Sequence, residues 1–217
     1  GVAEPGVAGP QAVPGAPPSP AVLTRQGAIA EQKRVRINTP RLHGSIALRG
    51  GRIDDLTLGT YHETPDPRSP EVVLLEPSGT GHAYFAEFGW VGGTQGVTVP
   101  GSETLWAASG NPLTPASPVT LTWDNGQGLD FTRTISVDEN YMFTVRDAVR
   151  NTTGAPVTLS PYGLISRTGT PHVGGYFILH EGPVGYLAGS LREFGYTSIE
   201  PGDPKEYTST GGWLGFT

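Results

Sequence analysis

Five histidines are the side chains of this chain best suited to proton transfer at neutral pH. Two of them have neighbours that could support acid–base catalysis: His180 is followed directly by Glu181, and His172 lies in the Gly-rich segment GTPHVGG. A histidine and a carboxylate that converge on one substrate can act as general acid and general base. Adjacent residues of a β-strand point to opposite faces, so His180 and Glu181 cannot act together if YFILHEGPVGY is a strand. We therefore interpret His180 as a structural residue of a strand or an interface, and His172 as a solvated loop residue.

The remaining histidines and the lack of cysteine argue against a metal or cofactor site. His43, His62 and His82 are scattered among turn residues and show no spacing such as HExxH. The chain has no cysteine, which removes thiolate nucleophiles, disulfides and Cys-based zinc or iron–sulfur sites. Neither a G-x-S-x-G elbow nor a G-x-x-x-x-G-K-[ST] phosphate loop occurs. The sequence predicts no catalytic residue, no metal and no cofactor.

Two acidic segments have structural interpretations. Asp54 and Asp55 follow a Gly50-Gly51 turn, and we expect a solvated strand edge there, where charge blocks edge-to-edge aggregation, rather than a catalytic dyad. The segment DNGQG (124–128) lacks the residue order and the terminal Glu of an EF-hand calcium loop. It is predicted to be a plain hairpin loop.

A cluster of aromatic residues lies in YFAEFGWVG. Tyr84, Phe85, Phe88 and Trp90 could line a groove for an extended peptide or a glycan. Alternation along a strand places Phe88 and Trp90 on one face and Phe85 on the other. Core packing between sheets is the interpretation that we favour for this cluster.

Composition excludes several classes of partner and predicts a β protein. The net charge of −6 argues against binding to nucleic acid or to anionic lipid head groups, both of which need clustered Lys and Arg. The longest apolar runs, Val72–Leu75 and Ala83–Val91, are much shorter than the roughly 20 residues of a membrane-spanning helix. A hydrophobic content of 36% with 16% charged residues suits antiparallel sheets that bury one face.

The chain divides into a linker and a folded domain. Residues 1–23 are rich in Pro, Ala and Gly, a composition that forms neither a helix nor a strand and buries little surface. Thr24–Gln32 could add a short helical turn. We expect residues 1–33 to form a disordered or extended linker and residues 34–217 to form the domain.

Alternating polar and apolar residues predict strands throughout that domain, with little helix. Turn signals such as Gly50-Gly51, Asp124-Asn125-Gly126 and Asp138-Glu139-Asn140 separate the runs. Val72–Leu75 is continuously apolar and is predicted to be buried on both faces. The other expected strands are Arg34–Asn38, Gly44–Leu48, Arg52–Leu58, Ala83–Val91, Thr104–Ala107, Pro118–Trp123, Asp130–Val137, Tyr141–Arg150 and Val157–Ser166. Many strands with short connections indicate stacked antiparallel sheets.

Several segments, in order, resemble the YidC family of bacterial membrane protein insertases in its alphaproteobacterial form. They are RVRINTPRLHGSIALRGGRIDDLTL (34–58), YHETPDPRSPEVVLLEPSG (61–79), YFAEFGWVG (84–92), GLDFTRTISVDENYMFTV (128–145) and GGWLGFT (211–217). The resemblance implies an antiparallel β-supersandwich of the galactose-mutarotase type, located in the periplasm and preceded by a first transmembrane helix and a linker. It implies that insertion itself is carried out by a core of transmembrane helices beyond this chain. The role implied for this chain is that of a non-catalytic accessory or interaction domain of an inner-membrane insertase that acts alone or with the Sec translocon.

The resemblance also implies a partner surface. Gly163–Glu200 corresponds by order to the part of the family's domain that contacts the Sec accessory protein SecF, and the Sec accessory components SecD and SecF are the partners that the resemblance implies. The aromatic residues of this segment lie among small residues and few charges, the mixture that interface cores favour. The predicted surface consists of Tyr176, Phe177, Tyr186, Phe194 and Tyr196. The alternative is that these side chains close one end of the sandwich.

Two other functions remain open from the sequence. A mutarotase-like fold would also suit a carbohydrate-binding or sugar-epimerising domain, although fold alone is a weak guide to function. Hairpin spacing and a Pro-rich stalk would also suit an adhesion module.

Overall fold

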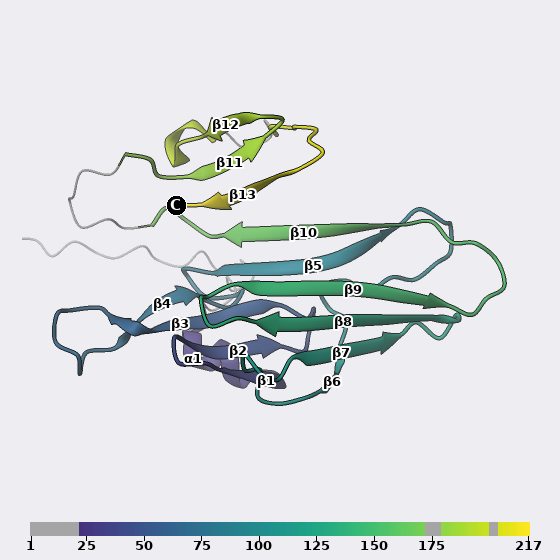
Figure 1. The fold of residues 1–217 in the computed structure, drawn as a ribbon, viewed down its shortest axis with the longest axis horizontal. Coiled ribbons are helices and arrows are strands. Elements are labelled where there is room, and N and C mark those ends of the chain that lie inside the picture. Colours follow the sequence, from purple (N-terminus) through teal and green to yellow (C-terminus); the bar gives the residue numbers. More distant parts are fainter. Residues whose placement is uncertain (1–21, 172–178, 200–203) are drawn as a thin grey trace, which may run out of the picture.

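A computed structural model of the chain describes residues 22–171, 179–199 and 204–217. Within these ranges the protein is built from antiparallel strands, with one short α-helix and one 3-10 turn (Figure 1). The elements are α1 (Arg25–Ala30), β1 (Arg34–Asn38), β2 (Leu42–Ala47), β3 (Ile53–His62), β4 (Glu71–Leu75), β5 (Tyr84–Gly92), β6 (Ala107–Ser109), β7 (Val119–Asp124), β8 (Leu129–Val137), β9 (Phe143–Asn151), β10 (Leu159–Arg167), β11 (Pro183–Leu187), β12 (Ser190–Glu193), η1 (Tyr196–Ser198) and β13 (Gly212–Phe216). The predicted all-β fold with little helix is confirmed.

The first sheet has the strand order β1-β2-β3-β5-β10, and β4 also pairs with β3. The β2–β3 hairpin turns through Gly50 and Gly51, whose φ angles of 75° and 63° lie in the region that favours glycine. Its register passes from Ser45 opposite Asp55 to Ile46 opposite Ile53. Asp54 therefore has no opposite residue, and β3 carries a bulge at this point.

The second sheet is a meander in the order β6-β7-β8-β9. Strand β8 alternates buried and half-buried residues over its whole length, as one face toward the core requires. In the β7–β8 loop the Asp124 carboxylate accepts a hydrogen bond from the Gly126 amide at 2.8 Å, and the Asn125 side chain accepts one from the Gln127 amide at 2.8 Å. The predicted hairpin loop is confirmed.

The hydrophobic core lies between these two sheets and draws on both. Ile37, Ile46 and Leu42 from the first sheet belong to the same buried cluster as Phe131 and Ile135 from the second. Trp90 and Phe88 pack against this cluster, and the Trp90 and Phe131 ring centroids lie 6.4 Å apart. The core interpretation of these two aromatics is confirmed.

A third, three-stranded sheet in the order β12-β11-β13 lies beside β10, outside the two main sheets (Figure 1). It was not expected from the sequence, where Gly and Pro interrupt the apolar pattern. Val72–Leu75 is a strand, as predicted, but the prediction that it is buried on both faces was wrong. The segment forms β4, which pairs with β3 and leaves Val73 and Leu74 exposed rather than buried.

Helix α1 lies within the segment that the sequence assigns to the linker. Thr24 caps it by accepting a hydrogen bond from the Gly27 amide, and Ala28 is buried. Residues 1–21 lie outside the described residues, so the linker boundary at residue 33 stays a prediction. No helix among the described residues is long and apolar enough to cross a membrane.

Candidate functional site

The contacts of His180 in the structure are to residues other than Glu181. His180 lies in the irregular segment before β11 and not in a strand, so the strand condition considered for this segment does not apply to His180. Its Nε2 is 3.2 Å from the Pro183 carbonyl, and its Nδ1 is 3.9 Å from a Glu193 carboxylate oxygen. These contacts fit the structural role that we expected for His180. His172 lies outside the described residues.

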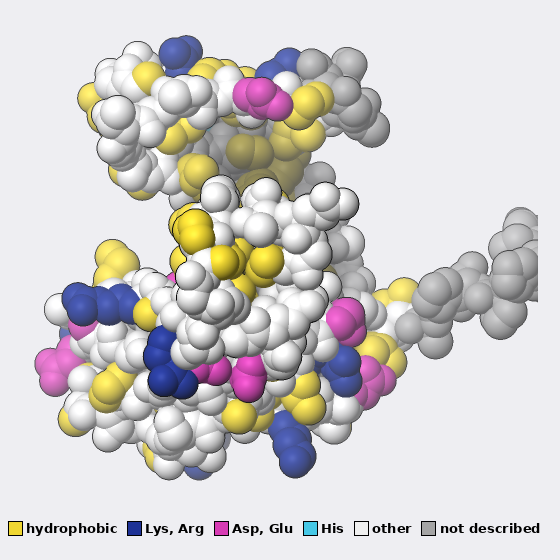
Figure 2. Space-filling model, turned by 90° about the vertical axis from the view of Figure 1, so that its right-hand side faces the viewer, with side chains coloured by type: hydrophobic (Ala, Val, Ile, Leu, Met, Phe, Trp, Pro, Cys, Tyr) yellow, Lys and Arg dark blue, Asp and Glu magenta, His cyan; other side chains and the backbone are white. Residues whose placement is uncertain are grey.

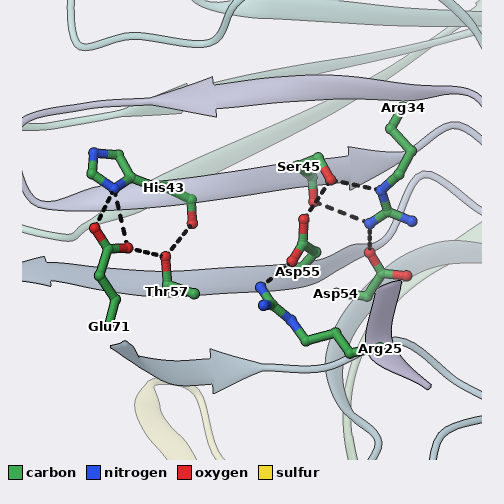
Figure 3. A network of polar contacts seen from close by, with 8 residues as sticks. All are labelled: Arg25, Arg34, His43, Ser45, Asp54, Asp55, Thr57 and Glu71. Atoms are coloured by element: carbon green, nitrogen blue, oxygen red, sulfur yellow. Dashed lines mark hydrogen bonds and ion pairs between the residues drawn. The ribbon is translucent and has the colours of Figure 1, made fainter. Parts of the chain in front are cut away.

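His43 lies on β2, in the polar contacts of Figure 3, and not in a turn as the sequence suggested. Its Nδ1 is 2.8 Å from a Glu71 carboxylate oxygen, and the Thr57 hydroxyl donates to the other oxygen of the same carboxylate. The Thr57 hydrogen bond, with a smaller contribution from His43, holds the pKa of Glu71 below its ordinary value. This cluster ties β2, β3 and β4 together at one end of the sheet.

Asp54 and Asp55 are buried, so the prediction of a solvated strand edge was wrong. Asp54 is paired with Arg34 of β1, and Asp55 is paired with Arg25 of α1 (Figure 3). The Ser45 hydroxyl donates to Asp55 at 2.6 Å and accepts from Arg34 Nε at 2.6 Å, which links the two pairs. Burial raises the pKa of Asp54, and the Arg34 charge opposes that shift. Each carboxylate is held by its own arginine, so that Asp54 ties β3 to β1 and Asp55 ties β3 to α1.

Two further buried ionic contacts were missed by the sequence reasoning. Arg133 of β8 is fully buried and donates two hydrogen bonds to Asp147 of β9, at 2.8 and 2.9 Å. Its guanidinium also lies 5.1 Å from the Trp106 ring centroid. The sequence contained a signal for the burial of Arg133, because this residue occupies an inward position of the alternating strand DFTRTISV.

The second contact joins β5, β10 and Arg52, the residue just before β3. Arg52 Nε donates to one Glu87 oxygen at 2.5 Å, and the Tyr162 hydroxyl donates to the other at 2.8 Å. Burial and this hydrogen bond to a carboxylate both raise the pKa of Tyr162. Within the described residues, no group of three or more His, Cys, Asp or Glu side chains is placed to hold a metal ion.

The described residues of the predicted partner surface do not lie on one face of the third sheet. Tyr186 on β11 lies opposite Leu191 on β12 and opposite Trp213 on β13. The three side chains are 46%, 54% and 54% exposed. Residues opposite one another in register share a face of the sheet. We call this exposed row, Tyr186, Leu191 and Trp213, the outer face.

The other predicted aromatics lie elsewhere. The Phe194 ring packs against Tyr207, with ring centroids 6.3 Å apart, while Tyr196 stacks on Phe216 and donates a hydrogen bond to the Thr217 carbonyl at 2.9 Å. Tyr176 and Phe177 lie outside the described residues. The structure thus places Tyr186 on the outer face and the two other described aromatics in packing contacts. Trp213, which the sequence reasoning had not assigned to a surface, joins Tyr186.

A cavity of about 420 Å³ separates the third sheet from β10. Figure 2 shows it as a hollow between the upper part of the molecule and the body, with hydrophobic side chains on its walls. We call it the slot. Its described walls include Leu164 and Ile165 of β10, Leu187 of β11, Phe194, and Leu214 and Phe216 of β13.

Comparison with known proteins gives one consistent family. The family model described as the YidC periplasmic domain matches residues 34–217. Proteins named membrane protein insertase YidC from Bradyrhizobium diazoefficiens and Methylobacterium nodulans are 55% and 53% identical over 199 and 200 residues, covering 90% and 91% of this chain. The same-named protein of Methylobacterium radiotolerans is 49% identical over 230 residues and covers 100% of the chain.

The chain spans about a third of these relatives, namely 32%, 33% and 37% of their lengths. The similarity extends through the buried core and the third sheet, since the matched residues reach Thr217. The order of segments noted in the sequence and the all-β fold agree with this match. The chain therefore belongs to the YidC family of membrane protein insertases, and its residues 34–217 are the periplasmic domain of that family.

Proposed function

We propose that the full-length protein inserts proteins into the bacterial inner membrane and that this chain is its non-catalytic periplasmic accessory domain. The names of the relatives support the first part. The second part is supported by the polar groups described above, because the buried carboxylates are held in ion pairs between strands. Such pairs have a structural role, because removal of one partner would leave an uncompensated charge in the interior.

An accessory domain needs a surface that contacts its partner, and the exposed outer face is the observation that supports this role. Tyr186, Leu191 and Trp213 form an exposed apolar row that spans three strands. Aromatic anchors of this kind, surrounded by small residues, are typical of interface cores. We assign the Sec accessory components SecD and SecF as the partners of this face, and substrate membrane proteins to the transmembrane part of the full-length protein.

The test is co-purification from membranes with the full-length protein. The double variant Tyr186→Ser/Trp213→Ser should capture at least fivefold less of the Sec accessory components. Its circular dichroism and melting temperature should stay close to those of the parent, because both side chains are half exposed. Leu105→Ser, at a position that is 56% exposed beside the second sheet, is the matched control and should capture normally.

Normal capture by the folded double variant would contradict the partner assignment. If the double variant melts several degrees early, Tyr186 and Trp213 contribute to packing, and the alternative that they close one end of the sandwich holds.

A carbohydrate-related function is the competing candidate, and the relatives' names give it no support. Polarimetry with α-D-glucose or α-D-galactose tests it directly. We expect mutarotation at the buffer rate. An acceleration that disappears in His180→Ala would overturn the non-catalytic assignment.

A further inference from the structure

The slot lies between two strand edges that have no backbone partner among the described residues. Strand β10 is the last strand of the first sheet, and β13 is the last strand of the third. Both strands contribute walls to the slot, β10 through Gly163, Leu164 and Ile165 and β13 through Leu214, Gly215 and Phe216. Two free edges therefore border one apolar space.

The parts of these edges that border the slot lack the features that protect a solvent-exposed edge. Charged side chains, proline and bulges are the usual protection against strand addition. Strand β13 reads GWLGF and has neither charge nor proline, whereas in β10 Pro161 lies before, and Arg167 after, the residues that border the slot. Leu164 and Leu214 are 44% and 63% exposed in the slot. Such edges would invite aggregation if nothing covered them.

We infer that one extended, apolar strand, supplied by a part of the full-length protein outside residues 1–217, fills the slot and pairs with the edges of β10 and β13. The pairing would join the first and third sheets into one continuous sheet, since an added strand satisfies the N–H and C=O groups of both edges. Alternate side chains of the added strand would contact Leu164 and Leu214, because side chains alternate along a strand.

The source of the strand follows from two observations. The relatives are about three times as long as the matched region, so most of their sequence is available to cover this surface. Thr217 also lies at the slot, because Phe216 lines it and the Thr217 carbonyl accepts a hydrogen bond from Tyr196. A chain that continues from Thr217 would enter the slot without a long connection.

Thiol labelling of the purified, full-length protein in detergent tests the inference. This region has no cysteine, so Leu164→Cys and Leu214→Cys each introduce a single probe once cysteines elsewhere are replaced by serine. Leu105→Cys is the reference, because Leu105 is 56% exposed and lies outside the slot. If the slot is filled, maleimide should label the two slot cysteines at least tenfold more slowly than the reference. Labelling at the rate of the reference would overturn the inference.

A photo-crosslinking residue at position 164 identifies the occupant. We expect mass spectrometry of the purified protein to find the cross-link on a peptide of the same molecule outside residues 1–217. A mixture of isotopically light and heavy protein separates this result from a contact between two copies, which would give mixed-mass products. Mixed products, a cross-link to a different protein, or protection that is lost on purification would each overturn the inference. None of these readouts depends on the outer face or on Sec components, so they are independent of the partner test.

Discussion

Asp54 and Asp55 are adjacent on β3 and are both buried, although the two neighbours would ordinarily point to opposite faces of a strand. The bulge beside Ser45 explains this arrangement, because Asp54 is the extra residue that the register skips. The bulge directs both carboxylates toward arginines, one from β1 and one from α1. At the scale of single residues, these pairs stabilise the fold chiefly because neither charge can be left alone in the interior.

Removing one partner of the buried pair should therefore be costly. We expect Arg34→Ala to lower the free energy of unfolding by about 3–5 kcal/mol, since it leaves Asp54 buried without its counter-charge. Urea denaturation measures the effect. Arg68→Ala is the control and should cost less than about 1 kcal/mol, because the Arg68 side chain is 89% exposed in its pair with Asp66. A loss for Arg34→Ala as small as that of the control would refute this account.

Glu71 should make the stability depend on pH in the acid range. Its folded-state pKa lies below the ordinary value of 4.5, so it contributes stability above that pH and loses the contribution as the pH falls through the lowered pKa. Glu71→Gln should be less stable than the parent at pH 7 by up to about 1 kcal/mol, and the difference should shrink as the pH falls from 4.5 through the lowered pKa. The raised pKa of Asp54 changes stability with pH in the opposite direction, and it does so in both proteins. Melting curves of Glu71→Gln and of the parent must therefore be compared with each other at each pH. An equal difference at pH 7 and pH 3 would speak against the Thr57–Glu71–His43 contacts.

At the scale of elements, the third sheet depends on glycines that let its strands approach closely. A Cβ added to Gly212, whose φ is +131°, would lie 2.0 Å from the Tyr186 carbonyl oxygen across the β11–β13 pairing. A Cβ on Gly215 of the same strand meets no atom within 4 Å. Gly215 has neither the positive φ nor the close neighbour of Gly212, so it serves as the control position on the same strand.

We expect Gly212→Ala to detach β13 from β11 while leaving the main sandwich folded. Hydrogen–deuterium exchange should rise at least tenfold for the amides of both strands, and the core strands β7 and β8 should keep their protection. Gly215→Ala should exchange like the parent. Identical exchange in the two variants would show that the close approach at Gly212 is not required.

The strands of the two main sheets could be predicted from the sequence because their alternation is undisturbed. Arg34–Asn38 is observed as predicted, and Asp130–Val137 differs from β8 by one residue. The bulge at Asp54 could not be predicted, since it depends on the register between two strands and not on the composition of one. The third sheet could not be predicted either, because its pairing joins Pro183–Leu187 to Gly212–Phe216 across a long separation in sequence. Tyr186 was found from its residue type, whereas its neighbours on the outer face become apparent only from that pairing.

At the scale of the whole molecule, α1 connects the N-terminal segment to the sandwich. The Leu23 amide donates a hydrogen bond to the Gly79 carbonyl at 3.0 Å, and Arg25 is paired with the buried Asp55. Among the described residues, the stretch from Leu23 through α1 is therefore attached to the sandwich.

Two deletions should separate the linker from the attached helix. Removing residues 1–21 should leave the melting temperature within about one degree, because their composition buries little surface. Removing residues 1–30 should destabilise the domain by about 2 kcal/mol or more, roughly 4–8 °C, since Asp55 loses its arginine. Differential scanning calorimetry measures both. Equal melting temperatures for the two truncated proteins would show that α1 is not part of the folded unit.

The shared core has a consequence for the order of events during synthesis. Strands β1–β3 leave the ribosome first, but Ile37 and Ile46 are buried against a cluster that includes Phe131 and Ile135 of β8. Translation proceeds at roughly 5–20 residues per second, so the apolar face of the first strands stays exposed for on the order of ten seconds before β8 has been synthesised. The meander β7-β8-β9 has only short loops to close and can form as soon as it emerges. The apolar face of the N-terminal β2–β3 hairpin is therefore uncovered during the interval between its own synthesis and that of β8.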